Sequence, residues 1–183
     1  FAMYQIAAQS VGATPVIAPD RLLGSDVDSL LKHVGPDTRV CYLANPNNPT
    51  GTFLSSDEVA RLREGLSDSV LLVIDAAYAE YVRREGYSDG IALVDRYDNV
   101  VVTRTFSKIF GLASLRLGWL YGPSKVVDAL NRIRCPFNAT GAAQAAGMAA
   151  LKDVAFVEAA VAHNDQWRPW VDKQGRKTPA HGK

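Results

Sequence analysis

The sequence has little that could support a disulfide framework, a metal site or a membrane span. It contains two cysteines and three histidines in 183 residues, and Cys41 and Cys135 lie far apart without a pairing pattern. Such usage predicts free, buried thiols in a reducing compartment. The histidines show no ligand spacing, so we expect no bound metal. No apolar run approaches the roughly 20 residues that a membrane helix needs.

An excess of charge of either sign is also lacking. Lysine and arginine together number 20 against 19 for aspartate and glutamate, a formal net charge of +1. Neither nucleic acid nor an anionic membrane is therefore an expected partner, whereas a small molecule or a second copy of the chain is. The first residues do not resemble a signal peptide, and we expect a cytoplasmic protein. The apolar content of 48% is enough for one substantial core.

What the sequence does contain is an alternation of helix and strand patterns. Capping candidates precede two of the helices, namely Ser25 or Asp26 and Ser55. Strands separated by helices predict an α/β fold with a mostly parallel sheet and helices on both faces. The expected strands are 14–18, 40–44, 70–74, 100–102 and 117–121. The expected helices are 2–11, 27–34, 55–66, 124–134, 139–151 and 154–170.

Polar residues follow three of these strands at the point where each strand ends. Asn48 follows the strand 40–44, Asp75 ends the strand 70–74, and the segment 105–108 follows the strand 100–102. Ligands of parallel α/β sheets gather beyond the carboxyl ends of the strands. We therefore expect these residues to meet at one edge of the sheet.

The residue types at this edge suit a phosphorylated aromatic aldehyde. A lysine such as Lys108 can form an imine with an aldehyde. The hydroxyls of Thr105 and Ser107 and the guanidinium of Arg116 can hold a phosphate. A carboxylate such as Asp75 can pair with a ring nitrogen. The set predicts pyridoxal phosphate as cofactor.

Each of these residues also has a plainer interpretation. Asn48 precedes a proline and could only start a turn, Asp75 could cap a helix, and Tyr78 could be a core residue. Lys108 and Arg116 could be surface charges. Their apolar neighbours in the sequence favour instead a partly buried amine for Lys108 and a fixed anionic partner for Arg116.

Taken together, the motifs resemble those of the fold-type I pyridoxal-phosphate aminotransferases. The segments that carry the resemblance are 45–52, 75–78 and 103–119, and the likeness extends over residues 1–171. Two finer signals, 136–138 followed by 142–144 and the segment 163–170, are most similar to the histidinol-phosphate aminotransferases.

The resemblance implies a role for each candidate. Lys108 would be the Schiff-base lysine and the catalytic residue. The implied cofactor contacts are Asp75 at the pyridine nitrogen, Asn48 and Tyr78 at the ring hydroxyl oxygen, Thr105, Ser107 and Arg116 at the phosphate, and Phe1 stacked on the ring.

The implied reaction is transamination between glutamate and imidazole acetol phosphate, giving histidinol phosphate and 2-oxoglutarate in histidine biosynthesis. The partners would be an amino donor, a phosphorylated keto acceptor and a second copy of the chain in a homodimer. Aromatic aminotransferases and threonine-phosphate decarboxylases share the cofactor motifs and stay open as alternatives. A non-catalytic interaction module that keeps the fold is a further alternative.

The sequence departs from this family in two residues and in extent. Ala76 stands where glutamate is common, and Ser114 stands where glycine is usual. Family members are about twice as long, so we expect an incomplete large domain with impaired activity. The expected organisation is a cofactor domain at 1–135, a helical continuation at 136–171, and a disordered tail at 172–183.

Overall fold

The structure is a computed structural model that describes residues 2–175. Its internal contacts divide the chain into two compact units. The first consists of Phe1–Thr105 with Gly118–Asn138, and the second of Phe106–Leu117 with Ala139–Lys183. The domain boundaries expected at residues 135 and 171 stay predictions.

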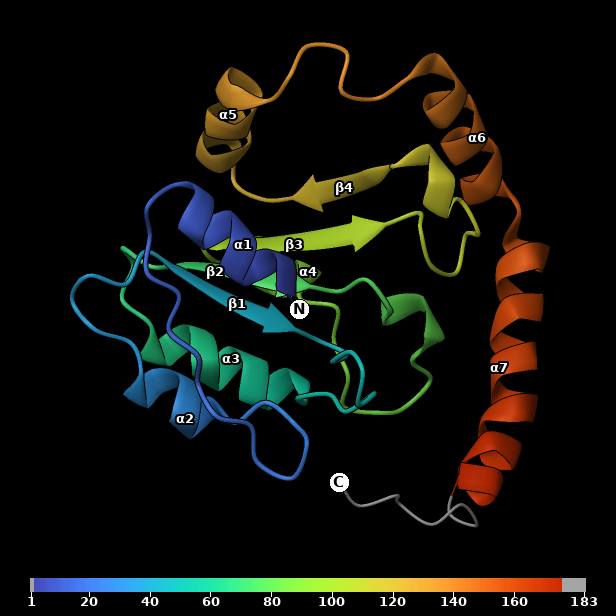
Figure 1. The fold of residues 1–183 in the computed structure, drawn as a ribbon, viewed down its shortest axis with the longest axis horizontal. Coiled ribbons are helices and arrows are strands. Elements are labelled where there is room, and N and C mark those ends of the chain that lie inside the picture. Colours follow the sequence, from blue (N-terminus) through green and yellow to red (C-terminus); the bar gives the residue numbers. More distant parts are fainter. Residues whose placement is uncertain (1, 176–183) are drawn as a thin grey trace. The chain divides into compact units, whose positions relative to one another are not determined.

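The first unit contains a four-stranded sheet in the order β1-β2-β3-β4 (Figure 1). The strands are β1 (Val40–Ala44), β2 (Leu71–Asp75), β3 (Val100–Thr105) and β4 (Gly118–Tyr121). The first three run parallel and β4 runs antiparallel to β3. The expectation of a mostly parallel α/β sheet is confirmed.

Helices of the first unit cover both faces of this sheet. They are α1 (Ala2–Ser10), α2 (Val27–Lys32), α3 (Ser56–Gly65), α4 (Ile91–Val94), α5 (Ser124–Ile133) and the short 3-10 helix η1 (Ala79–Tyr81). Cys41 and Leu43 of β1 belong to the same buried cluster as residues of α2 and α3. Tyr42 lies between them and points to the opposite face, where it stacks against Tyr4 of α1.

The core of this unit lies between the sheet and the helices α2 and α3. Alternate residues of each strand turn toward those helices, and the residues at these positions are apolar. Leu43, Leu72, Ile74 and Leu62 of α3 are each at most 1% exposed. Helix α3 packs closely against α2, since a side chain at Gly65 would come within 2.6 Å of Leu31.

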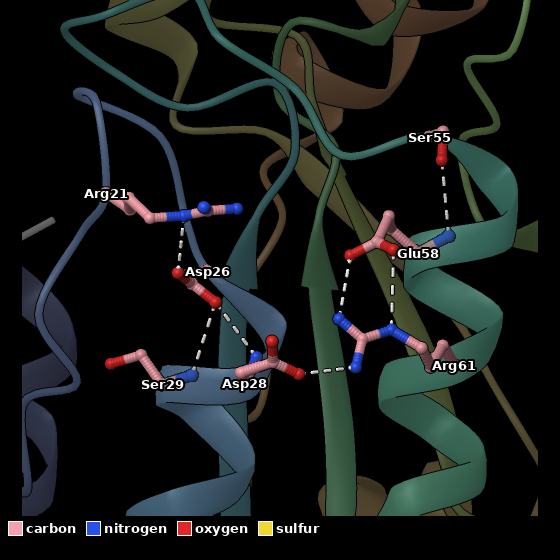
Figure 2. Close-up of polar contacts among 7 residues, drawn as sticks. All are labelled: Arg21, Asp26, Asp28, Ser29, Ser55, Glu58 and Arg61. Atoms are coloured by element: carbon pink, nitrogen blue, oxygen red, sulfur yellow. Dashed lines mark hydrogen bonds and ion pairs between the residues drawn. The ribbon is translucent and has the colours of Figure 1, made fainter.

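The starts of α2 and α3 are fixed by side-chain caps, as Figure 2 shows. Asp26 accepts hydrogen bonds from the backbone N–H groups of Asp28 and Ser29, so it is the cap of α2. Ser55 accepts from the N–H of Glu58 at the start of α3. Arg61 then joins the two helices, with Asp28 on one side (2.6 Å) and Glu58 on the other (3.1 Å).

The strand expected at 14–18 is wrong. These residues form no regular element, and Val16 and Ile17 are 66% and 67% exposed. Pro15 and Pro19 explain this, because a proline has no backbone N–H to contribute to a sheet. The apolar pattern indicated a strand, but Pro15 interrupts the row of N–H donors that pairing uses.

The second unit joins the turn Phe106–Leu117, which contains the 3-10 helix η2 (Ala113–Leu115), to the helices α6 (Gly141–Lys152) and α7 (Val154–Gly175). Within its described part the buried residues are few: Phe106, Ile109, Ala143, Gly147 and Val161. A side chain at Gly147 of α6 would come within 2.5 Å of Leu117, so this glycine permits close contact with the turn.

Helix α7 continues four residues into the segment 172–183 that was expected to be disordered. A tail without apolar periodicity is thus helical as far as Gly175, because a helix once formed propagates at little cost. The rest of that segment lies outside the described residues, as does Phe1.

Two further expectations concern the thiols and membranes. Both cysteines are free, but only Cys41 is buried and Cys135 is exposed. The expectation of two buried thiols is therefore wrong for Cys135. Burial raises the pKa of the Cys41 thiol to about 11. Within residues 2–175, no helix combines the length and the apolar character needed to cross a bilayer.

The core between the sheet and α3 is expected to dominate the stability of the first unit. Leu62→Ala removes a side chain that is 0% exposed and should lower the free energy of unfolding by about 2–5 kcal/mol. The matched control is Leu22→Ala, since Leu22 is 91% exposed and its loss should cost less than about 0.5 kcal/mol. Urea unfolding measures both, and equal effects would contradict this account of the core.

Candidate functional site

The carboxyl ends of the parallel strands bring polar residues to one edge of the sheet. Ala44 of β1 lies beside Asp75 of β2, and Asp75 lies beside Thr103 of β3. The loop that carries Asn48 leaves β1 at this edge, and Thr105 is the last residue of β3. The parallel register therefore determines that the ends of β1, β2 and β3 can serve one site.

Asp75 is half-buried at the end of β2, with both carboxylate oxygens in use. Its Oδ2 accepts a hydrogen bond from the hydroxyl of Tyr4 at 2.5 Å. Its Oδ1 accepts from the backbone N–H of Ala77 at 3.2 Å. The nearest following helix, η1, has Tyr78 as its cap residue. Asp75 is consequently not a helix cap, and the plainer interpretation of this residue is wrong.

Tyr4 was not among the residues expected at the site. Burial raises its pKa above the usual range, and the hydrogen bond to Asp75 adds to this shift. The hydroxyl therefore keeps its proton and acts as a donor at neutral pH. Its ring stacks on that of Tyr42, with centroids 4.6 Å apart and planes at 10°. No local pattern predicts a contact between residues 71 positions apart in the sequence.

Asn48 and Tyr78 are brought together from separate loops. The side-chain amide of Asn48 donates to the hydroxyl oxygen of Tyr78 over 2.8 Å. The loop that carries Asn48 is anchored by Asn45, which is 1% exposed and exchanges two hydrogen bonds with the backbone of Leu54. The hydroxyl of Tyr87 donates to the backbone oxygen of Asn45. These contacts fix the start of the loop, three residues before Asn48.

A half-buried arginine holds the segment that follows Asp75. Arg104 of β3 binds Glu80 at 2.8 Å and Asp89 at 2.9 Å. Its guanidinium also lies over the ring of Trp119, 5.5 Å from the centroid. Glu80 belongs to η1, two residues beyond Tyr78. The arginine thereby ties the loop carrying Tyr78 to the third strand.

Lys108 belongs to the second unit, in a turn that closes on itself. The N–H of Phe106 donates to the oxygen of Leu117, and the N–H of Gly111 donates to the oxygen of Lys108. Phe106 and Ile109 are 5% and 2% exposed, whereas Lys108 is exposed. The apolar neighbours turn into the unit and leave the lysine outside. The expectation of a partly buried amine is therefore wrong.

Arg116 lies at the end of the same turn in a left-handed conformation, with φ at 52°. Its Nη1 donates to the backbone oxygen of Ala113 at 2.6 Å and reaches the Oγ of Ser107 at 3.4 Å. The second distance is beyond the usual range of a strong N–H···O bond. Ser107 and Arg116 are neighbours in this turn, but Arg116 is exposed instead of set among apolar side chains.

The described structure thus forms two groups of the expected residues. Asn48 pairs with Tyr78 in the first unit, where Asp75 is held by Tyr4. Ser107 and Arg116 lie together in the second unit on the turn that also carries Lys108. Thr105 ends β3, and Phe1 lies outside the described residues. The roles expected for these residues stay predictions.

Each unit, taken by itself, presents functional groups of known chemistry: a carboxylate in the first, and an exposed amine with a guanidinium beside a hydroxyl in the second. An exposed amine can react with an aldehyde, a carboxylate can accept from a ring N–H, and a guanidinium beside a hydroxyl can donate to a phosphate. Among the described residues, no cluster of histidine, cysteine and acidic side chains is arranged to hold a metal.

Comparison with known proteins identifies relatives of this chain. It is 61% identical over 168 residues to a histidinol-phosphate aminotransferase of Rhodospirillum centenum, covering 92% of the chain and 46% of that protein. A protein of the same name from Paramagnetospirillum magneticum is 57% identical over 174 residues, covering 95% of the chain and 48% of its own length. The chain spans about half the length of the curated relatives that it matches.

A solved structure and a family description agree with these relatives. The histidinol-phosphate aminotransferase of Sinorhizobium meliloti, solved in complex with pyridoxal-5'-phosphate, superposes with a TM-score of 0.88 at 29% identity. The superposition covers 93% of this chain and 47% of that one. The family "Aminotransferase class I and II" matches residues 1–167. This match spans nearly the whole sequence, and the chain therefore belongs to the class I and II aminotransferase family.

Proposed function

We propose that this chain is the cofactor-binding part of a histidinol-phosphate aminotransferase. The whole protein would transfer an amino group from glutamate to imidazole acetol phosphate and release histidinol phosphate and 2-oxoglutarate, a step of histidine biosynthesis. The observation that carries this proposal is the 61% identity over 168 residues to a relative with that name. The amine, carboxylate and guanidinium on the strand-end loops support it independently.

The residues present fit pyridoxal phosphate. Each carboxylate oxygen has about two lone-pair sites, so Asp75 retains acceptor capacity beside its two existing hydrogen bonds. Asn48 and Tyr78 form a donor pair suited to the ring hydroxyl oxygen. Ser107 and Arg116 offer donors for the phosphate, and Thr105 adds a hydroxyl at the end of β3.

In this proposal Lys108 is the reactive amine. When bound, pyridoxal phosphate supplies an aromatic ring that takes up negative charge from the substrate α-carbon. Lys108 Nζ would hold the cofactor through its aldehyde carbon, and the same amine would serve as the base that moves a proton at the substrate α-carbon. Asp75 accepts the hydrogen bond of the ring nitrogen and so supports the positive charge there. Exposure of Lys108 leaves its amine accessible to substrate.

We further propose a cytoplasmic homodimer. A transamination between small, water-soluble molecules needs no membrane or nucleic-acid partner. Large apolar side chains remain exposed in both units, which supports coverage by a second copy. Those most exposed are Val11, Leu22, Leu23, Ile133 and Phe137, at 72% to 95%.

Cofactor binding through Lys108 has a direct optical test. Mixing the purified chain with pyridoxal phosphate should produce imine absorbance at the edge of the visible range, and reduction with borohydride should leave the adduct on the peptide containing Lys108. Lys108→Ala should abolish both signals. Lys125→Ala is the matched control, since Lys125 is an exposed lysine of α5. Absorbance that persists without Lys108, or is absent from the wild type, contradicts the proposal.

The phosphate contact of Arg116 can be separated from the rest of the site by comparing two ligands. The wild type should bind pyridoxal phosphate more tightly than pyridoxal. Arg116→Ala should weaken the phosphorylated ligand about 10-fold to 100-fold, the range expected for a hydrogen bond to a charged group. The affinity of Arg116→Ala for pyridoxal should equal that of the wild type.

Arg134→Ala is the control for this comparison, because Arg134 is exposed and contacts Asn131 and Asn138. Fluorescence titration gives all of these affinities. An equal loss for both ligands in Arg116→Ala would show that Arg116 supports the fold of the turn and not the phosphate.

Light scattering across a range of concentrations tests the homodimer. The exposed apolar residues predict a molar mass twice that of one chain, falling toward the single-chain value on dilution. The mass of one chain at every concentration would contradict the proposal.

A further inference from the structure

Asp75 has a second contact whose partner lies far away in the sequence. The hydroxyl of Tyr4 in α1 donates to Oδ2 of Asp75 at the end of β2. We propose that Tyr4 is a positioning residue: its hydroxyl holds the Asp75 carboxylate in the orientation in which it receives the ring N–H of the cofactor. This inference rests on the proposed function, because it gives Asp75 the role of partner to a ring nitrogen.

The carboxylate is held from two directions. Tyr4 approaches Oδ2 at 2.5 Å, within the range of strong O–H···O bonds to a carboxylate. The N–H of Ala77 reaches Oδ1 at 3.2 Å. A carboxylate with one donor could turn about its Cα–Cβ and Cβ–Cγ bonds, whereas two donors at different oxygens fix its plane. Each oxygen keeps a lone-pair site for a further donor.

Tyr4 is itself fixed by the sheet. Its ring is stacked on that of Tyr42, which belongs to β1 and lies beside Val73 of β2 in the parallel register. Near-parallel aromatic rings at this separation attract beyond their apolar contact area. The sheet therefore orients Tyr42, Tyr42 orients Tyr4, and Tyr4 orients Asp75.

The hydroxyl can act only as a donor toward Asp75. Burial and the neighbouring carboxylate both raise the pKa of Tyr4, so its proton stays in place at neutral pH. Oδ2 of Asp75 is the acceptor of this hydrogen bond. The direction of the hydrogen bond is thus determined, and its loss would remove one of the two constraints on the carboxylate.

The first test needs no cofactor. Nuclear magnetic resonance couplings between the Hα and Hβ protons of Asp75 report how many side-chain rotamers it samples. We expect one rotamer in the wild type and averaged couplings in Tyr4→Phe. The matched control is Tyr121→Phe, which also removes a hydroxyl that donates to an aspartate at 2.5 Å, namely Asp95.

The second test uses pyridoxal phosphate isotopically labelled at the ring nitrogen. In the wild type and in Tyr121→Phe, the nitrogen resonance should keep its protonated position to a higher pH than in Tyr4→Phe. Cofactor affinity in Tyr4→Phe should fall about tenfold, within the range of a lost hydrogen bond to a charged group. Tyr42→Leu keeps the hydroxyl of Tyr4 but removes the ring on which Tyr4 stacks. Its cofactor affinity and its nitrogen resonance should lie between those of the wild type and Tyr4→Phe.

The outcomes separate this inference from the proposed function. A single Asp75 rotamer and an unchanged nitrogen resonance in Tyr4→Phe would reduce Tyr4 to a packing residue and overturn the inference. If Tyr4→Phe does not fold, Asp75 couplings in Tyr42→Leu that equal those of the wild type overturn the inference equally. A wild type that takes up no cofactor contradicts the proposed function, and the Asp75 couplings then decide the role of Tyr4 alone.

Discussion

The parallel register of β1, β2 and β3 is the constraint on which the site of the first unit depends. It places Ala44, Asp75 and Thr103 side by side, so that three separate loops begin at one edge of the sheet. That register is held by apolar contact: the faces of β1 and β2 toward α2 and α3 are almost completely buried. A shift by one residue would turn Leu72 and Ile74 away from the helices. The positions of the polar residues are therefore set by the apolar ones.

Much of this could be predicted from the sequence because it depends on short-range patterns. The run 70–74 ending in Asp75, the cap at Ser55 and the strand-end position of Asn48 all follow from residues within a few positions of each other. The strand expected at 14–18 shows the limit of such reasoning. Its apolar residues suit a strand, but pairing also requires N–H donors, and Pro15 removes one of them.

The remaining differences arise where distant parts of the chain meet. The contact of Tyr4 with Asp75 joins residues 71 positions apart, and no local pattern encodes it. Lys108 has apolar neighbours in sequence, yet Phe106 and Ile109 turn inward while the lysine stays outside. A turn that closes on itself presents successive residues in different directions, so the polarity of sequence neighbours does not predict the burial of one side chain.

The antiparallel pairing of β3 with β4 has a consequence for the segment that carries Lys108 and Arg116. Thr105 lies opposite Gly118, so the chain leaves the sheet and re-enters it at adjacent positions. A side chain at Gly118 would come within 2.9 Å of the backbone oxygen of Arg104, which makes the point of return intolerant of larger residues. The residues between these two positions take no part in the register of β3 with β4. The segment that bears the amine and the guanidinium is therefore joined to the sheet at two positions that pair with each other.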